Sequence, residues 1–501
     1  MKNKILGGLI CLVLLCSLIL GAAPIQANNT NDLGDDCSSL AAGNLATVDG
    51  SVLFGHNEDD GACPTIMHVV PRVSHESGEK IVMWDTGGTI DQVVGETYAY
   101  LWSEMPGYSF SDSYLNEWGV SIASNSCSSS RETKPYDLTD GGIGYWLRRL
   151  PIERATTARE GVEIMGEFVE QLGYTASGRT YTIADPEEAW LFSAVAGKHW
   201  VAQRVPDDEV AFIPNYYTIR QVNLSDTANF LACPDLIQHA IDKGWYDPAS
   251  GPFDFAKVYN TTSTQASLGN KLRHWGALRL LTGIEYPDMS DLPFSVKPNR
   301  LLSVEDITEV LRCHYEGTVW QWNPTLSSSP HSYRLPDGTS IRTICTGSTQ
   351  ESFVMQLRSY MPSSIGNVYW RAQCRPCESA FIPWYSGILK VAEPYTIGEP
   401  GVPDNPESAY WTFQKMCQLV DADYANRIGT VREVWDKMEA QAFARQDNTE
   451  RTALTLYGKG DEHHQYLARK FLTQYTEGLA LKAYRKALEF IELWEPGWAG
   501  V

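Results

Sequence analysis

The pair Asp49-Gly50 constrains the fold more than any other short feature of this chain, because it lies between two runs of β-prone residues. An Asp-Gly pair in that setting is the strongest local signal for a β-hairpin. A tight turn there would pair residues whose numbers sum to about 99, so that residue 59 lies opposite residue 40. At about 3.3 Å per residue, Asp59 would then lie about 10 Å along the strand from Cys37. The hairpin therefore predicts that Cys37 and the segment His56–Asp59 meet at one end of a sheet.

The first 27 residues have the pattern of a secretory signal peptide. Two lysines precede an apolar run, Ile5–Leu20, and small residues follow as far as Ala27. The run is shorter than the roughly 20 residues of a membrane-spanning helix. We expect cleavage after Ala27 and export to a secreted, periplasmic or cell-surface location; an uncleaved membrane anchor is the alternative. Residues 28–36 are polar and predict a disordered spacer or propeptide.

The charge balance narrows the range of partners. The formal net charge is −21, and no basic run occurs in the chain. Nucleic acids and anionic membrane surfaces bind clustered Lys and Arg. We therefore expect no nucleic-acid partner, and no membrane association once the signal is removed, while a homo-oligomer stays open.

Strand-like and helical segments alternate without regular βαβ repetition, which favours an α+β fold over a parallel α/β fold. Helical periodicity predicts a helix over Thr157–Leu172 that ends at Gly173. Strands are expected at Lys80–Trp84, Gly119–Ser124, Ala189–Ala194 and His199–Val205.

A Pro- and Gly-rich break at residues 397–406 divides the mature chain. It separates a predicted domain, residues 37–396, from a predicted helical extension, residues 397–501. Helices of the extension are expected over residues 408–425, 430–446 and 462–493.

Cys37 follows the polar spacer and is the candidate nucleophile. Cys11 and Cys16 leave with the signal, so nine of 11 cysteines remain, and an odd number leaves one without a disulfide partner in its own chain. If residue 37 becomes the N-terminus, its α-amino group, with a reference pKa of about 7.7 to 8.0, could take the thiol proton. Asp59 could hold that amine. The alternative is a small buried residue at the start of a strand.

The segment from Cys37 to Asp59 resembles the N-terminus of the mature dipeptidase A family. These are cysteine peptidases of the N-terminal-nucleophile (Ntn) superfamily, related to bile salt hydrolases and penicillin V acylases. The resemblance implies a four-layer αββα sandwich, hydrolysis of amide bonds, typically in dipeptides, and autocatalytic cleavage after Asp36. The matching pieces, in chain order, are Cys37-Ser-Ser, Asp49-Gly50-Ser51, Gly55-His56-Asn57-Glu58-Asp59, Asn116-Glu117-Trp118-Gly119-Val120, Ile213-Pro214-Asn215-Tyr216, residues 342–358 and residues 376–385.

The resemblance also assigns roles by position. It implies that Cys37 is the nucleophile, that Asp59 orients the α-amine, and that Asn215 donates a hydrogen bond to the oxyanion. It also implies a second oxyanion donor at Asn125, with the register uncertain by one residue, and a later site arginine at Arg342. Two further positions, His56 and Asn57, would bind substrate.

His56 departs from the family pattern, because related acylases carry an arginine just before the Asn-x-Asp motif. An arginine would help to hold the thiolate and bind substrate, whereas a neutral histidine supplies less positive charge at pH 7. His56 could instead pair with Cys37, which would make the α-amine dispensable. The other alternative is a polar residue at a strand end.

Cys374-Arg-Pro-Cys377 has the spacing of redox and zinc motifs. No second Cys or His pair with suitable spacing lies near it in the sequence, so we expect a disulfide or two structural thiols there. His314 ends an apolar helix and is expected to be packed rather than catalytic. We expect neither a metal nor a cofactor.

The sequence thus predicts an exported dipeptidase that forms a thioester acyl-enzyme on Cys37 and acts on a dipeptide or small amide. One alternative is an acylase that cleaves N-acyl amides on the same fold. The other is a secreted, non-catalytic binding protein.

Overall fold

The predicted hairpin lies at the centre of a seven-stranded sheet. Its two strands pair antiparallel and are buried along their whole length. Every neighbouring pair in this sheet is antiparallel. The strands, in spatial order, are β16 (Ser295–Val296), β14 (Val210–Ile213), β1 (Ser38–Ala42), β2 (Val52–Glu58), β19 (Glu351–Leu357), β20 (Val368–Gln373) and β21 (Ile382–Tyr385).

The register of the hairpin differs from the prediction, because Leu40 lies opposite Gly55 rather than residue 59. Asp49 does form a local turn, in which its side chain accepts from the backbone and hydroxyl of Ser51. The segment before it, however, forms a short 3-10 turn and then bonds to Leu302 instead of continuing the hairpin ladder. This longer connection shifts the pairing by four residues and brings the end of β2 closer to Cys37 than expected.

A second, eight-stranded antiparallel sheet packs against the first. The two sheets contact each other where β1 meets β10 and β11. The core strands of both sheets are buried on both faces, as expected for the inner layers of a sandwich. The strands, in spatial order, are β15 (Phe230–Ala232), β13 (Trp200–Arg204), β12 (Ala189–Gly197), β11 (Tyr174–Ala184), β10 (Ser121–Ser126), β9 (Tyr114–Asn116), β8 (Tyr100–Glu104) and β3 (Ile66–Val70).

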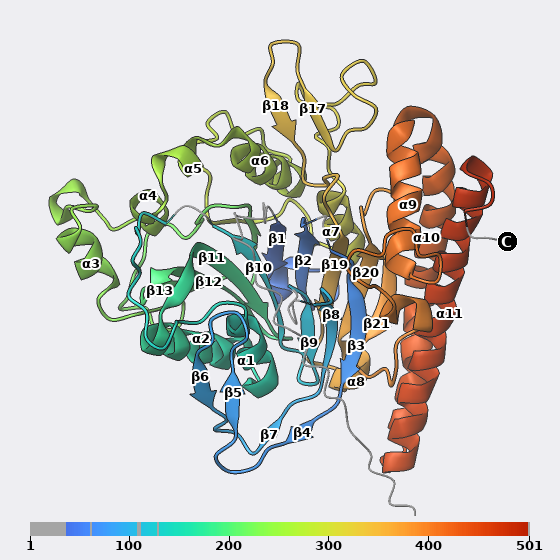
Figure 1. The fold of residues 1–501 in the computed structure, drawn as a ribbon, viewed down its shortest axis with the longest axis horizontal. Coiled ribbons are helices and arrows are strands. Elements are labelled where there is room, and N and C mark those ends of the chain that lie inside the picture. Colours follow the sequence, from blue (N-terminus) through green and yellow to red (C-terminus); the bar gives the residue numbers. More distant parts are fainter. Residues whose placement is uncertain (1–36, 61–62, 108–111, 128–129, 499–501) are drawn as a thin grey trace, which may run out of the picture. The chain divides into compact units, whose positions relative to one another are not determined.

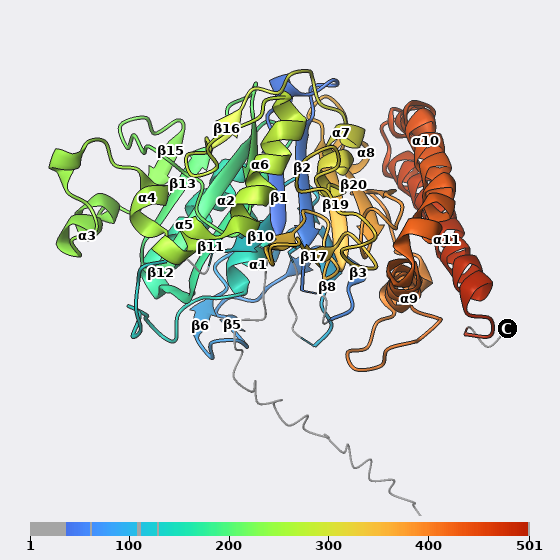
Figure 2. The same cartoon turned by 90° about the horizontal axis from the view of Figure 1, so that it is seen from above.

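Helices cover the outer face of each sheet, which gives the expected four-layer αββα order (Figures 1 and 2). On the eight-stranded sheet, α1 (Trp146–Arg154) and α2 (Ala158–Leu172) contact β9–β12. On the seven-stranded sheet, α6 (Leu268–Thr282) and α7 (Val304–Leu311) contact β14, β2 and β19. The α+β class and the αββα sandwich are confirmed.

Gly55 in the middle of β2 allows α7 to approach the sheet closely. A Cβ atom at this position would lie 2.7 Å from side-chain atoms of Ile307 on α7 and of Leu40 on β1. Contacts that short do not occur without displacement of the neighbours, so a larger residue would push α7 away from the strand that carries His56 and Glu58.

Most predicted segments occur with small shifts at their ends. The helix over Thr157–Leu172 is α2, with Thr157 as its N-cap and Gly173 at its end in a positive-φ conformation. The four predicted strands correspond to β5, β10, β12 and β13. The remaining elements are the two-stranded sheets β4 (Val73–Ser74) with β7 (Glu96–Thr97), β5 (Lys80–Val82) with β6 (Thr89–Asp91) and β17 (Ser332–Arg334) with β18 (Ser340–Arg342), and the short helices α3 (Leu236–Asp242), α4 (Phe255–Tyr259), α5 (Thr262–Ala266) and α8 (Ser363–Gly366).

The predicted C-terminal helices pack against the β20–β21 side of the seven-stranded sheet (Figure 1). They are α9 (Ala409–Ala422), α10 (Tyr424–Tyr457) and α11 (Glu462–Trp494), and α10 starts earlier and ends later than predicted. Trp435 of α10 donates its indole N–H to the backbone of Glu378, and Glu439 accepts from the backbone of Phe381. These contacts anchor α10 to the segment that joins β20 to β21.

This computed structural model describes residues 37–60, 63–107, 112–127 and 130–498. The predicted signal peptide, residues 1–27, and the predicted spacer, residues 28–36, lie outside these ranges. All described residues belong to one compact unit, Gly34–Val501. Within the described ranges, none of the helices combines the length and the apolar character needed to cross a membrane.

A buried ion pair joins α10 to the end of β19 and provides a test of this anchoring. Arg358 donates two hydrogen bonds to Glu450, at 2.9 and 2.6 Å, and both side chains are buried. We expect Glu450→Ala to lower the free energy of unfolding by about 3 to 5 kcal/mol, because it leaves the Arg358 charge buried without its partner. Thermal melting of the purified variant measures the loss.

The matched control is Glu433→Ala on the same helix, which removes an exposed pair with Lys437. Its effect should stay within about 0.5 kcal/mol. Equal melting temperatures for the two variants would contradict the anchoring role of Glu450.

Candidate active site

Cys37 lies directly before β1, and the register of β1 decides what lies beside it. Ser38 pairs with Asn57 and Ser39 pairs with Ile213. Continuation of these two registers places Cys37 opposite Glu58 on one side and opposite Asn215 on the other. Directly opposed residues of an antiparallel sheet point to the same face, so these three side chains share the face toward the second sheet.

The thiol of Cys37 is fully buried and points at a carboxylate. Its Sγ donates to Glu58 Oε1 at 3.5 Å. The other oxygen of Glu58 lies 3.1 Å from Nε2 of His56, and Nδ1 of His56 lies 2.8 Å from the Ser39 hydroxyl. The expected pairing of His56 with Cys37 is therefore indirect, because the Glu58 carboxylate lies between them.

His56 is neutral at pH 7 because it is fully buried between the sheets. Burial lowers its pKa from 6.5 to about 4. Asp112 opposes this shift, while Arg148 and Arg179 add to it. Asp112 in turn forms ion pairs with both arginines, so its negative charge is already compensated. The position that carries a cation in related acylases is thus occupied here by an uncharged imidazole.

Asp59 follows β2 and is held by two groups from a distant part of the chain. Its Oδ1 accepts from the Thr349 hydroxyl at 2.5 Å, and its Oδ2 lies 3.3 Å from Arg342 Nη2. Arg342 is the last residue of β18, and Thr349 lies in the segment that joins β18 to β19. Asp59 directly follows Glu58, which the register of β2 places opposite Cys37.

A buried arginine of α6 connects Cys37 with Asn215. Arg273 donates to the Cys37 carbonyl at 2.9 Å and to Asn215 Oδ1 at 2.6 Å. Because the amide oxygen of Asn215 accepts from a guanidinium, its NH₂ group must face the other way, where it donates to the Ser126 carbonyl at 2.9 Å. Arg273 therefore sets the orientation of the Asn215 amide beside Cys37.

A polar cleft of about 340 Å³ opens at Asn215 and Arg273, whereas Cys37 itself is fully buried and does not line it. Asn215, Arg273 and Arg342 line it, and the hydroxyls of Ser263, Thr264 and Ser267 complete its wall. The side chain of Arg342 is 29% exposed, whereas Arg273 is buried. Arg342 is thus the cation that a solute in the cleft can reach.

The structure places two of the expected site residues in other roles. Asn57 points to the opposite face of β2 and donates to the carbonyls of Leu311 and Ile344, so it ties α7 to the neighbouring loop and does not face the cleft. Asn125 accepts from Ser39 and donates to the carbonyl of Ile213, which tethers the two sheets. On β10, the residue that bonds to the Asn215 side chain is Ser126, one position further along.

Sequence reasoning missed Glu58, Arg273 and Thr349. Glu58 is the variable residue of the Asn-x-Asp motif, and only strand pairing brings it to Cys37. Arg273 lies within a helix whose sequence has no marked pattern, and its role depends on where α6 packs. Thr349 lies in a loop, and nothing in its neighbourhood indicates a contact with Asp59.

Comparison of the sequence with known proteins shows which family the chain belongs to. The sequence model of peptidase family C69 matches residues 36–437. The chain belongs to peptidase family C69. The match begins next to Cys37 and extends into α10. The matched part of the chain therefore includes the sandwich and part of the C-terminal helices. The expected class of enzyme, a peptide-bond hydrolase of the cysteine type, is confirmed.

The names of the curated relatives agree with the assignment to family C69. A probable dipeptidase of Latilactobacillus sakei is 29% identical over 402 residues, covering 77% of this chain and 81% of the relative. A probable dipeptidase of Salmonella dublin is 28% identical over 367 residues, covering 70% and 81%. Dipeptidase A of Lactobacillus helveticus is 24% identical over 452 residues, covering 85% and 90%. The resemblance to the dipeptidase A family is confirmed.

Two solved structures also resemble parts of the chain. Penicillin V acylase from Agrobacterium tumefaciens is 13% identical, with a TM-score of 0.34, and the match covers 67% of this chain and 82% of that one. A variant of the conjugated bile acid hydrolase from Clostridium perfringens is 12% identical, with a TM-score of 0.28, covering 67% and 89%. The family assignment rests on the sequence match.

The pKa of His56 predicts how stability depends on pH. The folded protein holds His56 neutral down to about pH 4, whereas the unfolded chain takes up a proton at about pH 6.5. The free energy of unfolding therefore falls as the pH drops from 6.5 to 4, and the His56 imidazole contributes about 3 kcal/mol to that fall. Replacement His56→Gln removes that contribution, so melting temperature should fall less steeply over this range than in the wild type.

His463→Gln is the matched control, because His463 is exposed on α11. Its melting temperature should follow the pH dependence of the wild type. If His56→Gln does so as well, the histidine is not held neutral in the folded protein.

Proposed function

We propose that the protein is an exported dipeptidase whose nucleophile is the Cys37 thiolate, made N-terminal by cleavage after Asp36. The observation that carries the proposal is the polar cleft lined by Arg342, by three residues with hydroxyl groups, and by Asn215 and Arg273, of which Arg273 donates to the Cys37 carbonyl. A dipeptide is short and charged at both ends, and it fits such a lining. An N-acyl chain would need an apolar lining.

The α-amine of residue 37 supplies the base in this mechanism. It takes the thiol proton, and the thiolate attacks the peptide carbonyl to give a tetrahedral oxyanion. Asn215, whose amide is oriented by Arg273, donates a hydrogen bond to that oxyanion. The carbon–nitrogen bond then breaks, the leaving amine takes the proton, and a thioester remains on Cys37. Water hydrolyses the thioester and restores the thiol.

Asp59 positions the amine in this scheme. Its carboxylate is buried and is itself held by Thr349 and Arg342, so it has a defined orientation beside residue 37. A negative charge there favours the ammonium form that arises when the amine takes the thiol proton. The ammonium in turn compensates the thiolate next to the Glu58 carboxylate.

Export is supported by the N-terminal sequence alone. The apolar run Ile5–Leu20, with small residues up to Ala27, provides the signal peptide, and residues 28–36 provide the segment removed afterwards. The mature protein then acts on peptides outside the cytoplasm.

Substitution of Cys37 tests the nucleophile and the processing together. We expect Cys37→Ala to retain residues 28–36 and to lower dipeptide hydrolysis at least about 1000-fold, because the thiolate is lost. N-terminal sequencing and a panel of dipeptides and N-acyl amino acids measure the two effects. The control Cys233→Ala removes a buried thiol elsewhere and should be processed and active.

Each result of the panel separates the alternatives. Hydrolysis of N-acyl amino acids but not of dipeptides would make the protein an acylase. Absence of hydrolysis of either class by the wild type would favour a binding protein. Active wild-type enzyme that begins at residue 28 would overturn the role of the α-amine.

Arg342 tests how the substrate is held. We propose that its exposed guanidinium binds the C-terminal carboxylate of the dipeptide. Arg342→Gln should then raise KM for dipeptides about 10- to 100-fold, the effect of losing a charge-assisted hydrogen bond. The same variant should hydrolyse the corresponding dipeptide amides, which lack the carboxylate, as well as the wild type does.

Arg334→Gln is the matched control, because Arg334 is exposed on β17, the partner strand of β18. It should leave KM unchanged. An equal fall in kcat for dipeptides and their amides in Arg342→Gln would instead show that Arg342 acts through Asp59.

A further inference from the structure

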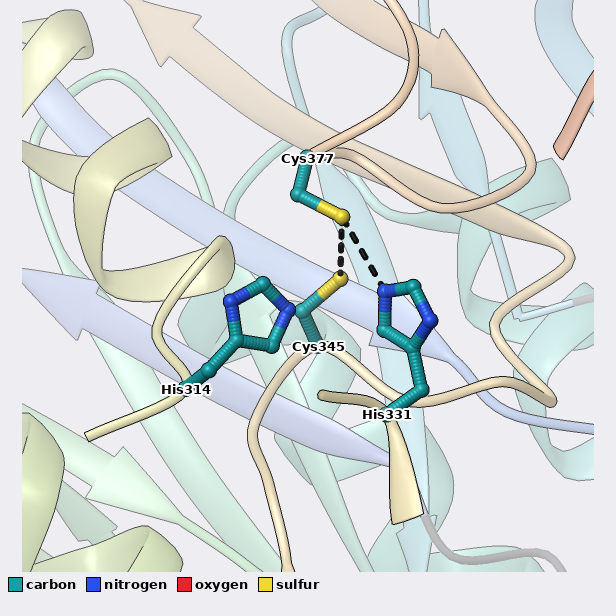
Figure 3. Close-up of side chains that lie close together, drawn as sticks. All are labelled: His314, His331, Cys345 and Cys377. Carbon is teal, nitrogen blue, oxygen red and sulfur yellow. Dashed lines mark hydrogen bonds between the residues drawn. The ribbon is translucent and has the colours of Figure 1, made fainter. Parts of the chain in front are cut away.

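Four side chains converge at the base of the β17–β18 hairpin (Figure 3). They are His314, His331, Cys345 and Cys377, all are buried, and their donor atoms lie within 4.8 Å of one another. Cys345 Sγ and Cys377 Sγ are 3.5 Å apart, and Nε2 of His331 is 3.1 Å from Cys377 Sγ. Cys374 and Cys377 form no disulfide, so the Cys-x-x-Cys motif has two buried thiols, the second of the two states expected for it.

The donor set and its spacing match a tetrahedral zinc site. Two thiolates and two imidazoles are a common ligand set for structural Zn²⁺. With Zn–S bonds of about 2.3 Å, the two sulfurs of a regular tetrahedron lie about 3.8 Å apart. The observed 3.5 Å is close to this separation. Figure 3 shows the two imidazole rings flanking the two sulfurs, as convergent ligands do.

A carboxylate holds the outer nitrogen of each histidine. Nδ1 of His314 lies 3.0 Å from Glu316, and Nδ1 of His331 lies 2.6 Å from Asp421. These contacts leave Nε2 of both rings to face the sulfurs, and Nε2 of His314 has no hydrogen-bond partner among the described residues. Carboxylate–histidine pairs of this kind orient the imidazoles that bind metals.

The charges of the four ligands also suit a divalent cation. Zn²⁺ with two thiolates and two neutral imidazoles has no net charge, which lowers the cost of burial. Binding would release the two thiol protons to solvent.

We propose that His314, His331, Cys345 and Cys377 bind one structural Zn²⁺ ion. The ion clamps the base of the β17–β18 hairpin, because His331 directly precedes β17 and Cys345 follows β18. The same segment carries Arg342 and Thr349, the two residues that hold Asp59. The metal thus stabilises the wall of the cleft without touching the reacting atoms.

The decisive measurement is the metal content of the full-length, purified protein, with inductively coupled plasma mass spectrometry. We expect about one zinc per chain, and X-ray absorption with two sulfur ligands at about 2.3 Å and two nitrogen ligands at about 2.0 Å. Replacement by Co²⁺ should give the visible spectrum of a tetrahedral cobalt thiolate. Both measurements are independent of peptidase activity.

Two variants locate the ion. Cys345→Ser should lower the zinc content at least tenfold, and His239→Ala should leave it unchanged. His239 is the matched control because it belongs to another histidine-containing group, with Glu132 and His199. If Cys345→Ser does not fold, the ligand count from X-ray absorption on the wild type still decides the assignment.

Three results would overturn the proposal. The first is wild-type protein without zinc that also takes up neither Zn²⁺ nor Co²⁺ after reduction. The second is a Cys345–Cys377 disulfide in the peptide mass spectrum. The third is loss of zinc in His239→Ala with normal zinc in Cys345→Ser, which would place the ion at the other group.

Discussion

The site depends on one backbone arrangement, the pairing of β1 with β2 on one side and with β14 on the other. Hydrogen bonds of both ladders fix Cys37 between Glu58 and Asn215, although these residues are far apart in the chain. A slip of one residue in either ladder would turn the opposed side chain to the other face of the sheet. Because β1 is buried on both faces and paired at both edges, such a slip would also exchange the buried side chains of its two faces.

A polar layer between the two sheets supports this arrangement. Asp112, Arg148 and Arg179 form a buried ion cluster whose charges act on His56, and the chain Ser39–His56–Glu58 leads to the Cys37 thiol. Buried polar groups are stable only when they are paired, so each member restricts the conformation of the next. The neutral state of His56 is a consequence of this enclosure. At pH 7, His56 therefore supplies no positive charge to the Cys37 thiol.

Two distant segments complete the site from outside the central sheet. Helix α6 contributes Arg273, and the end of β18 with the loop that follows it contributes Arg342 and Thr349. The position of that loop depends on the buried cluster of His314, His331, Cys345 and Cys377, which joins the loop to the end of α7 and to the segment after β20. The proposed metal therefore influences the proposed orientation of the α-amine through the chain that connects its ligands to Arg342 and Thr349. It does so without contacting the amine.

Local patterns in the sequence determined the hairpin, helix α2 with its caps, the C-terminal helices and the family, because each depends on residues close together in the chain or on motifs in a set order. The hairpin register was wrong by four residues, since Asp49-Gly50 does not show that the segment before it bonds to Leu302. Only the tertiary structure assigned Glu58, Arg273 and Thr349 to the site and turned Asn57 away from it. It also brought Cys377 to two histidines and a cysteine rather than to Cys374. Strand pairing and packing between distant segments decide such contacts, and the sequence near each residue does not predict them.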